Sequence, residues 1–233
     1  MRQNTICFSS VGKENMCTHC NNGVAIRYGY TKGGNQRLRC TSCRKTKVQT
    51  YKYNAYNPTL NKQIVTLSNE GLGIRSIARA LSVSTTTLLS RFLKIAESIP
   101  MPPITMKSIY EVDEICTFVR NKENKIWIVY GLDRTTKNIA CFSVGKRTKR
   151  TLNVVLKTLL LSKAKRIYTD DLRLYKTLLP NTIHKVTRFG TNHIERCNLS
   201  LRTHLKRLSR RSICFSKSLK MLNATLKIYF WSQ

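Results

Sequence analysis

Four cysteines near the start of the chain have a spacing that is typical of a zinc site. They form two pairs, Cys17 with Cys20 and Cys40 with Cys43, with two residues inside each pair and nineteen between the pairs. Two such turns complete the tetrahedral thiolate shell of a structural Zn²⁺. The alternative is chance spacing in a chain with 9 cysteines. We expect a zinc ribbon, with a β-hairpin between the pairs, within residues 1–57.

Acidic residues are scarce, and three of them stand where a metal-dependent enzyme would need them. The chain has 11 Asp and Glu against 42 Lys and Arg. Asp113 falls within a predicted strand, Asp170 at the end of another, and Glu195 on a helix. Carboxylates are ligands that Mg²⁺ or Mn²⁺ prefers, and two such ions can assist an in-line phosphoryl transfer. We expect Asp113, Asp170 and Glu195 to be catalytic and to bind two divalent ions.

Neighbouring acids leave alternatives open. Asp171 could replace Asp170 as a ligand, or cap the helix that follows it. Glu111 shares a strand face with Asp113 by alternation, and could support the metal site from further out. We expect Glu114 to be an exposed strand charge.

The elements that would position these carboxylates lie in residues 108–233, and their predicted order is βββαβαβα. The strands are expected at 109–119, 126–130, 138–144, 166–169 and 184–186, and the helices at 151–161, 172–178 and, long and basic, from about 191. This order is that of a ribonuclease H-like α/β domain, in which the first strand is central and can meet the end of the fourth. The whole chain is therefore predicted to be an α+β multidomain protein.

Residues 58–107 have the apolar spacing of three helices. The second is expected at 74–80 and the third at 85–99, with Ser84 as its N-cap. This is a helix-turn-helix pattern, in which the last helix would face a DNA groove. An ordinary three-helix bundle is the alternative. The residues expected to contact DNA from this helix are Thr85, Thr86, Thr87, Ser90 and Arg91.

The charge of the chain indicates a polyanionic partner. The formal net charge is +31, and residues 1–57, 58–107 and 108–233 are each basic. A hydrophobic share of 41% excludes a chain that is disordered for lack of apolar residues. A surplus of this size favours nucleic acid as the partner. On the helix that carries Glu195, we expect Asn198, Arg202, Lys206 and Arg207 to contact DNA, with a solvated basic face as the alternative.

Five sequence runs resemble the aspartate-aspartate-glutamate transposases of the insertion sequence one family. They cover residues 111–114, 168–175, 193–202, 210–212 and 215–218, and the similarity extends over nearly the whole chain. The resemblance implies a zinc ribbon and a helix-turn-helix before a catalytic domain that cleaves DNA and transfers strands at the ends of an insertion sequence. It assigns the triad to Asp113, Asp170 and Glu195. Two departures affect the surroundings of the triad: Asp171-Leu172 replaces Gly-Trp, and Ile115-Cys116 replaces an aromatic residue.

The expected partners and location follow from this interpretation. Transposition joins two ends, so we expect at least a homodimer on double-stranded DNA, both insertion-sequence ends and target. The odd cysteine count and the lack of an apolar leader or span indicate a cytoplasmic protein, associated with the bacterial nucleoid, and no membrane partner. Two other functions remain open: a DNA-binding regulator of transposition with an inactive catalytic domain, and a structure-selective nuclease.

Overall fold

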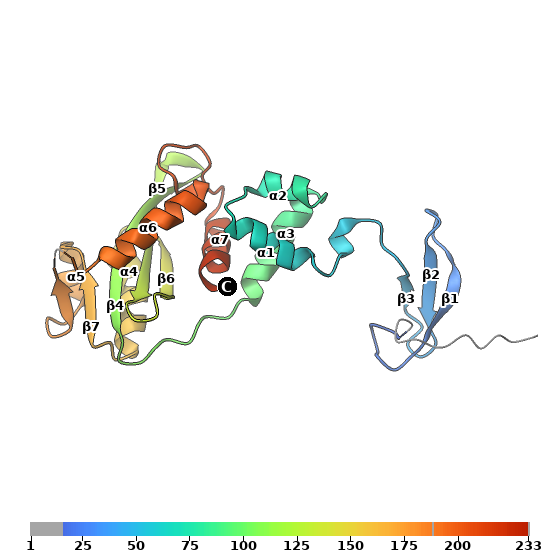
Figure 1. Cartoon of the computed structure of the whole chain (residues 1–233), viewed down its shortest axis with the longest axis horizontal. Helices are drawn as coiled ribbons and strands as arrows, with labels where there is room; N and C mark the ends of the chain where they lie inside the picture. The colour runs from blue at the N-terminus through green and yellow to red at the C-terminus, as the bar shows by residue number, and fades with distance from the viewer. Residues whose placement is uncertain (1–15, 188, 233) are drawn as a thin grey trace, which may run out of the picture. The chain divides into compact units, whose positions relative to one another are not determined.

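The computed structural model describes residues 16–187 and 189–232, so the first fifteen residues of the predicted ribbon segment lie outside the described residues. The chain forms two compact units, residues 1–57 and 58–233 (Figure 1). In the ranges described, no helix combines the length and apolar character needed to cross a membrane.

The first unit is a small antiparallel sheet. Its strands are β1 (Ala25–Tyr30), β2 (Gln36–Cys40) and β3 (Thr46–Val48), in the order β1-β2-β3, and a short 3₁₀ helix, η2 (Asn54–Tyr56), follows. The predicted hairpin between the cysteine pairs is β1 and β2. Among residues 16–57, which the structure describes, few apolar side chains are buried, including Ala25 and Leu38. A sheet with so small a core needs another source of stability.

The second unit begins with three helices, α1 (Leu60–Asn69), α2 (Ile74–Ala80) and α3 (Thr85–Ser98). The predicted bounds of α2 and α3 agree with these to within one residue. Ser84 caps α3, because its hydroxyl accepts a hydrogen bond from the Thr87 amide at 3.1 Å. The loop before α2 lies against the end of α6 (Asn192–His204): a Cβ on Gly71 would be 2.2 Å from the His204 carbonyl oxygen. Only glycine fits at this position, where φ is +77°.

A mixed five-stranded sheet forms the centre of the second unit. Three antiparallel strands, β4 (Ile109–Val119), β5 (Asn121–Asp133) and β6 (Ile139–Gly145), lead into the parallel strands β7 (Arg166–Thr169) and β8 (His184–Val186). The sheet order is β6-β5-β4-β7-β8. The first strand is therefore central and lies beside the fourth, as predicted, in a mixed α+β fold.

Helices cover both faces of this sheet. On one face, α4 (Lys149–Leu161) and α5 (Arg173–Leu178) pack on side chains such as Val112 and Val129. On the other, α6, the 3₁₀ helix η3 (Lys206–Leu208) and α7 (Leu219–Trp231) pack on Ile115, Ile128 and Tyr130. The helices α1 and α3 also contact α7.

The basic helix predicted from about residue 191 is α6, but it is shorter than predicted and does not reach Lys206 and Arg207. Helix α6 ends at His204, and α7 follows only after a loop. Residues 209–218 are rich in Ser and Arg and provide no apolar stripe that would continue a helix against the sheet. Ser218 then starts α7, since its hydroxyl accepts from the Met221 amide at 3.2 Å.

Candidate active site and metal sites

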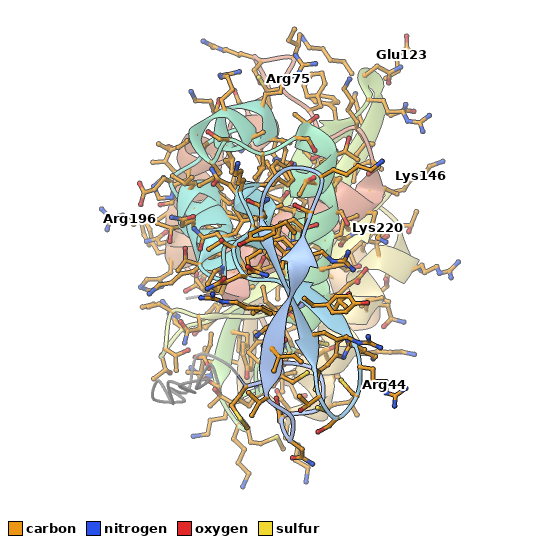
Figure 2. The ribbon with its side chains drawn as sticks, turned by 90° about the vertical axis from the view of Figure 1, so that its right-hand side faces the viewer. Arg44, Arg75, Glu123, Lys146, Arg196 and Lys220 are labelled. Carbon is orange, nitrogen blue, oxygen red and sulfur yellow. The ribbon has the colours of Figure 1, made fainter. Side chains whose placement is uncertain are left out.

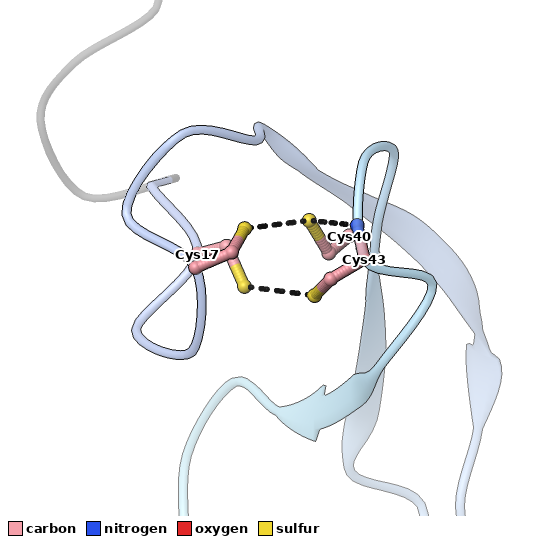
Figure 3. A group of neighbouring side chains, drawn as sticks. Cys17, Cys40 and Cys43 are labelled. Atoms are coloured by element: carbon pink, nitrogen blue, oxygen red, sulfur yellow. Dashed lines mark hydrogen bonds between the residues drawn. The ribbon is translucent and has the colours of Figure 1, made fainter.

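The four predicted zinc ligands lie together. The sulfur atoms of Cys17, Cys20, Cys40 and Cys43 are all within 4.8 Å of one another. Cys17 Sγ is 3.7 Å from Cys43 Sγ (Figure 3). Cys20 Sγ is 3.6 Å from Cys40 Sγ. A tetrahedron built with Zn–S bonds of about 2.3 Å has edges of about 3.8 Å. The four thiols are therefore close enough together to surround one Zn²⁺.

The backbone around these cysteines favours thiolates. The His19 amide donates to Cys17 Sγ, and the Cys43 amide donates to Cys40 Sγ, both at 3.4 Å. The amide hydrogen bond from His19 is the main reason that the pKa of Cys17 falls to about 6. The two turns are closely packed, since a Cβ on Gly23 would lie 2.4 Å from Cys40 Sγ.

Asp113 and Asp170 meet at one place on the central sheet. Asp113 is half-buried in the middle of β4, and Asp170 is exposed directly after β7. The two strands are parallel neighbours, with Tyr110 opposite Ile167. The carboxylate oxygens of Asp113 and Asp170 lie, with one of Glu114, within 4.8 Å of one another. The structure therefore brings together two of the three predicted catalytic acids.

Glu195 lies near this cluster without joining it. It is exposed on the first turn of α6, and its Oε1 accepts a hydrogen bond from the Thr191 hydroxyl at 3.0 Å. Burial raises the pKa of Asp113, and the negative charges of Asp170 and Glu195 raise it further. The charges of two other carboxylates thus add to the effect of burial on Asp113.

The prediction that Glu114 is exposed is wrong. Its side chain is only 1% exposed, and its Oε2 lies 3.0 Å from Arg147 Nη2. Its Oε1 accepts a hydrogen bond from the Tyr175 hydroxyl at 3.1 Å. Arg147 in turn lies 4.4 Å from the ring centre of Trp127. Because β4 is central, both of its faces are covered, so alternation along the strand does not expose Glu114.

Glu111 contacts the start of α6. Its buried carboxylate accepts hydrogen bonds from His193 Nδ1 at 2.6 Å and from the Ile194 amide at 2.9 Å, and it pairs with Arg134 at 3.3 Å. The negative charge lies at the positive end of the helix dipole, where it is stabilising. Glu111 therefore holds the helix that carries Glu195.

Asp171 points to a different partner from Asp170. Its side chain is 75% exposed and lies 2.6 Å from Lys176 Nζ. The hydrogen bond from Lys176, with the charge of that ammonium group, lowers the pKa of Asp171. It is not one of the acids that cluster with Asp113 in the described part of the chain.

The predicted DNA contacts on and after α6 differ in exposure. Asn198 contacts the carboxylate cluster, because its Nδ2 donates to Asp113 Oδ2 at 2.6 Å. Arg202 is half-buried, and its Nε has no hydrogen-bond partner within the residues described. Arg207 donates to the Ser216 hydroxyl at 3.1 Å, and burial lowers its pKa. Lys206 is exposed.

The predicted DNA contacts on α3 lie along its first two turns. Thr85, Thr86 and Ser90 are exposed, whereas Thr87 and Arg91 are half-buried. Basic side chains also point outward from other parts of the second unit, among them Arg75, Lys146 and Arg196 (Figure 2). A basic surface therefore extends beyond the residues predicted to bind DNA.

Sequence reasoning missed the partners that hold these acids. Tyr130 hydrogen-bonds Asn198, Tyr175 and Arg147 hold Glu114, and Arg134 pairs with Glu111. One signal was present for Tyr130: if β4 and β5 form a hairpin, the register places Tyr130 opposite Asp113. The other partners come from distant segments with no shared spacing.

The chain matches a model of one protein family. Residues 107–232 match the family "IS1 transposase". The insertion element iso-IS1n protein InsB of Shigella dysenteriae is 34% identical over 116 residues, which are 50% of this chain and 88% of that protein. The insertion element IS1 protein InsB of Shigella flexneri is 34% identical over 119 residues, 51% of this chain and 91% of that protein.

Two solved structures show weaker similarity. An intasome of simian T-cell lymphotropic virus gives a TM-score of 0.38 at 15% identity, over 70% of this chain and 66% of that one. The HTLV-2 integrase catalytic core with magnesium gives 0.35 at 17% identity, over 55% of this chain and 86% of that one. TM-scores this low say nothing about function. The family model, in contrast, covers more than half of the chain. The chain therefore belongs to the IS1 transposase family and is a DDE-type DNA transposase.

Proposed function

We propose that this transposase cleaves DNA at the ends of an insertion sequence and joins strands to a target, using Asp113, Asp170 and Glu195. The observation that carries this assignment is the meeting of Asp113 and Asp170, from two neighbouring strands, within 4.8 Å. Glu195 stands on α6, the helix whose Asn198 hydrogen-bonds Asp113. The pKa of Asp113 is raised by burial and, to a lesser extent, by the charges of Asp170 and Glu195.

The proposed fold of the catalytic region, residues 108–233, is ribonuclease H-like. The sheet order β6-β5-β4-β7-β8 supports this class, because the strand with the first aspartate is central and the strand with the second lies beside it. The final acid then comes from α6, on the sheet face that Asp113 shares with Tyr130. We therefore propose that Glu195 completes the site that Asp113 and Asp170 form.

The carboxylate cluster suits divalent cations such as Mg²⁺ or Mn²⁺. Its donors are oxygens, and Asp170 is exposed to incoming ligands. Asp113, Asp170 and Glu195 would hold two such ions, which would supply Lewis-acid stabilisation of the attacking and leaving oxygens. The protein's own part is to hold Asp113 in place: the Glu114 amide donates to its Oδ1 at 2.7 Å, and Asn198 donates to its Oδ2.

Residues 1–57 and 58–107 are proposed to bind DNA, as a zinc ribbon and a helix-turn-helix. The cysteine spacing supports Zn²⁺ in the ribbon. The exposed hydroxyls of Thr85, Thr86 and Ser90 at the start of α3 support groove contacts, with Thr87 and Arg91 beside them. Arg202, Lys206 and Arg207 would add contacts to DNA phosphates near the carboxylates.

The assembly and the site of action are also proposals. Two insertion-sequence ends must be joined, so we propose at least a homodimer on DNA. The matched relatives come from bacteria, which supports action on nucleoid DNA in the bacterial cytoplasm.

The test separates binding from chemistry. Asp170→Asn should bind DNA that contains the insertion-sequence ends as tightly as the parent protein does, yet lose Mg²⁺-dependent cleavage by at least about a thousandfold. Asp171→Asn is the matched control, because its carboxylate pairs with Lys176 instead of joining the cluster, and it should still cleave. Cleavage by Asp170→Asn at the parental rate would disprove the assignment. A parent protein that binds but never nicks in Mg²⁺ would instead be a regulator.

A further inference from the structure

A buried tyrosine is connected to Asp113 through one side chain. Tyr130 on β5 is the direct cross-strand neighbour of Asp113 on β4. The Tyr130 hydroxyl donates to Asn198 Oδ1 at 2.6 Å, and Asn198 Nδ2 donates to Asp113 Oδ2 at 2.6 Å. Two strands and one helix, β4, β5 and α6, therefore meet in a chain of two short hydrogen bonds.

The tyrosine determines which end of the Asn198 amide faces Asp113. Tyr130 is fully buried, and burial raises its pKa, so the phenol stays neutral with one proton to donate. Its contact with the Ile194 carbonyl is longer, at 3.2 Å, so the shorter bond to Asn198 is favoured. With its oxygen held by the phenol, the amide presents its NH₂ group to the carboxylate. A reversed amide would place one acceptor against another.

The amide in turn fixes the Asp113 carboxylate. One oxygen accepts from the Glu114 backbone and the other from Asn198. A carboxylate has about four acceptor sites, so two hydrogen bonds leave capacity for a cation. With a donor on each oxygen, the group cannot rotate without losing a bond. Asn198 also lies three residues after Glu195 on α6, one helical turn along the same side, so this contact sets the position of Glu195 too.

We propose that Tyr130 is a positioning residue of the metal site, which acts through Asn198 to hold the Asp113 carboxylate ready for a divalent cation. The proposal rests on the proposed function, in which Asp113 is a metal ligand. Asn198 then serves to orient Asp113, since its amide oxygen is hydrogen-bonded to Tyr130 and its amide nitrogen to Asp113. Tyr130 itself touches neither metal nor DNA in this account.

In the test, the full-length protein is titrated with Mn²⁺ in the absence of DNA, and the dissociation constant is measured by calorimetry. Tyr130→Phe removes only the hydroxyl, and the dissociation constant for Mn²⁺ should rise about tenfold, as it does when outer partners of metal ligands are removed. Tyr110→Phe is the matched control. Tyr110 is equally buried on β4, but its hydroxyl donates to the Thr105 carbonyl, away from the cluster. Its Mn²⁺ affinity should not change.

Each outcome decides one claim. Parental Mn²⁺ affinity in Tyr130→Phe, or an equal loss in Tyr110→Phe, would overturn the positioning role. If Tyr130→Phe does not fold, Asn198→Ala decides, because Asn198 is only half-buried and its loss should weaken Mn²⁺ binding at least as much. Parental affinity in that variant also overturns the proposal. Asp113→Asn separately tests the proposed function: if it binds Mn²⁺ as the parent does, the metal site itself is wrong.

Discussion

The acidic residues of the second unit include two groups, proposed metal ligands and buried acids that form ion pairs. Asp113 and Asp170 approach each other and one oxygen of Glu114, and their own carboxylates accept hydrogen bonds from backbone and amide donors, which leaves them suited to a cation. Glu111 and Glu114, in contrast, are buried and pair with Arg134 and Arg147. Acids of the first kind are proposed for chemistry, and those of the second hold the structure around it.

Replacing Arg147 should show that its ion pair with Glu114 stabilises the fold. Arg147→Met leaves a carboxylate that is 1% exposed without its cation, and the free energy of unfolding should fall by about 1–3 kcal/mol. Urea unfolding measures this change. Lys146→Met, at the exposed neighbouring position, is the control and should stay within about 0.5 kcal/mol of the parent (Figure 2). Equal effects of the two substitutions would contradict the burial argument.

At the scale of elements, β4 and α6 do most to form the site. The central strand carries Glu111, Asp113 and Glu114, and α6 carries Glu195 and Asn198. The helix is attached to the strand at two levels, by Glu111 at its first turn and by Asn198 one turn later. The position of Glu195 therefore depends on contacts that β4 makes.

Loss of the first of these contacts should loosen α6. Glu111→Gln keeps the size of the side chain. It removes the negative charge that the His193 ring, the Ile194 amide and the Arg134 guanidinium all contact. Amide hydrogen exchange in residues 192–204 should become faster, and DNA cleavage slower, while DNA binding is retained. Glu123 lies in the exposed part of β5 (Figure 2), so Glu123→Gln should change neither amide exchange in α6 nor DNA cleavage. Unchanged exchange in Glu111→Gln would show that the contact does not hold the helix.

The sequence predicted elements better than it predicted side-chain partners. Alternation and helical spacing are local signals, and they located β4, β7, α2 and α3 closely. The burial of Glu114 could not be predicted in this way, because it depends on Arg147 and Tyr175 from other segments. Helix α7 was not predicted, because the basic residues before it made residues 206–233 look like a continuation of the preceding basic helix.

At the scale of the whole molecule, the +31 charge is distributed over two compact units with different sources of stability. The unit of residues 58–233 has two apolar clusters, one on each face of its sheet. The described part of the first unit, residues 16–57, has few buried apolar residues and a group of four thiols. Its folding should therefore depend on the metal.

Removal of zinc should unfold the first unit alone. Purified protein should contain about one zinc per chain, and a strong chelator should expose residues 16–57 to protease while 58–233 stays resistant. Metal analysis and limited proteolysis followed by mass spectrometry measure both effects. A Cys40→Ser variant should behave as the chelated protein does. Fewer than about half an equivalent of zinc, or a first unit that resists protease without it, would exclude a structural zinc.

The central claim depends most on Glu195, since the structure places Glu114 and not Glu195 within 4.8 Å of both aspartates. The most direct measurement is the Mg²⁺-dependent cleavage rate of Glu195→Gln beside that of Glu114→Gln, on DNA carrying the insertion-sequence ends. If Glu195 is the third catalytic acid, Glu195→Gln binds this DNA but cleaves it at least about a thousandfold more slowly, whereas Glu114→Gln still cleaves. Cleavage by Glu195→Gln at the parental rate, with loss of cleavage in Glu114→Gln, would contradict the account and make Glu114 the third catalytic acid.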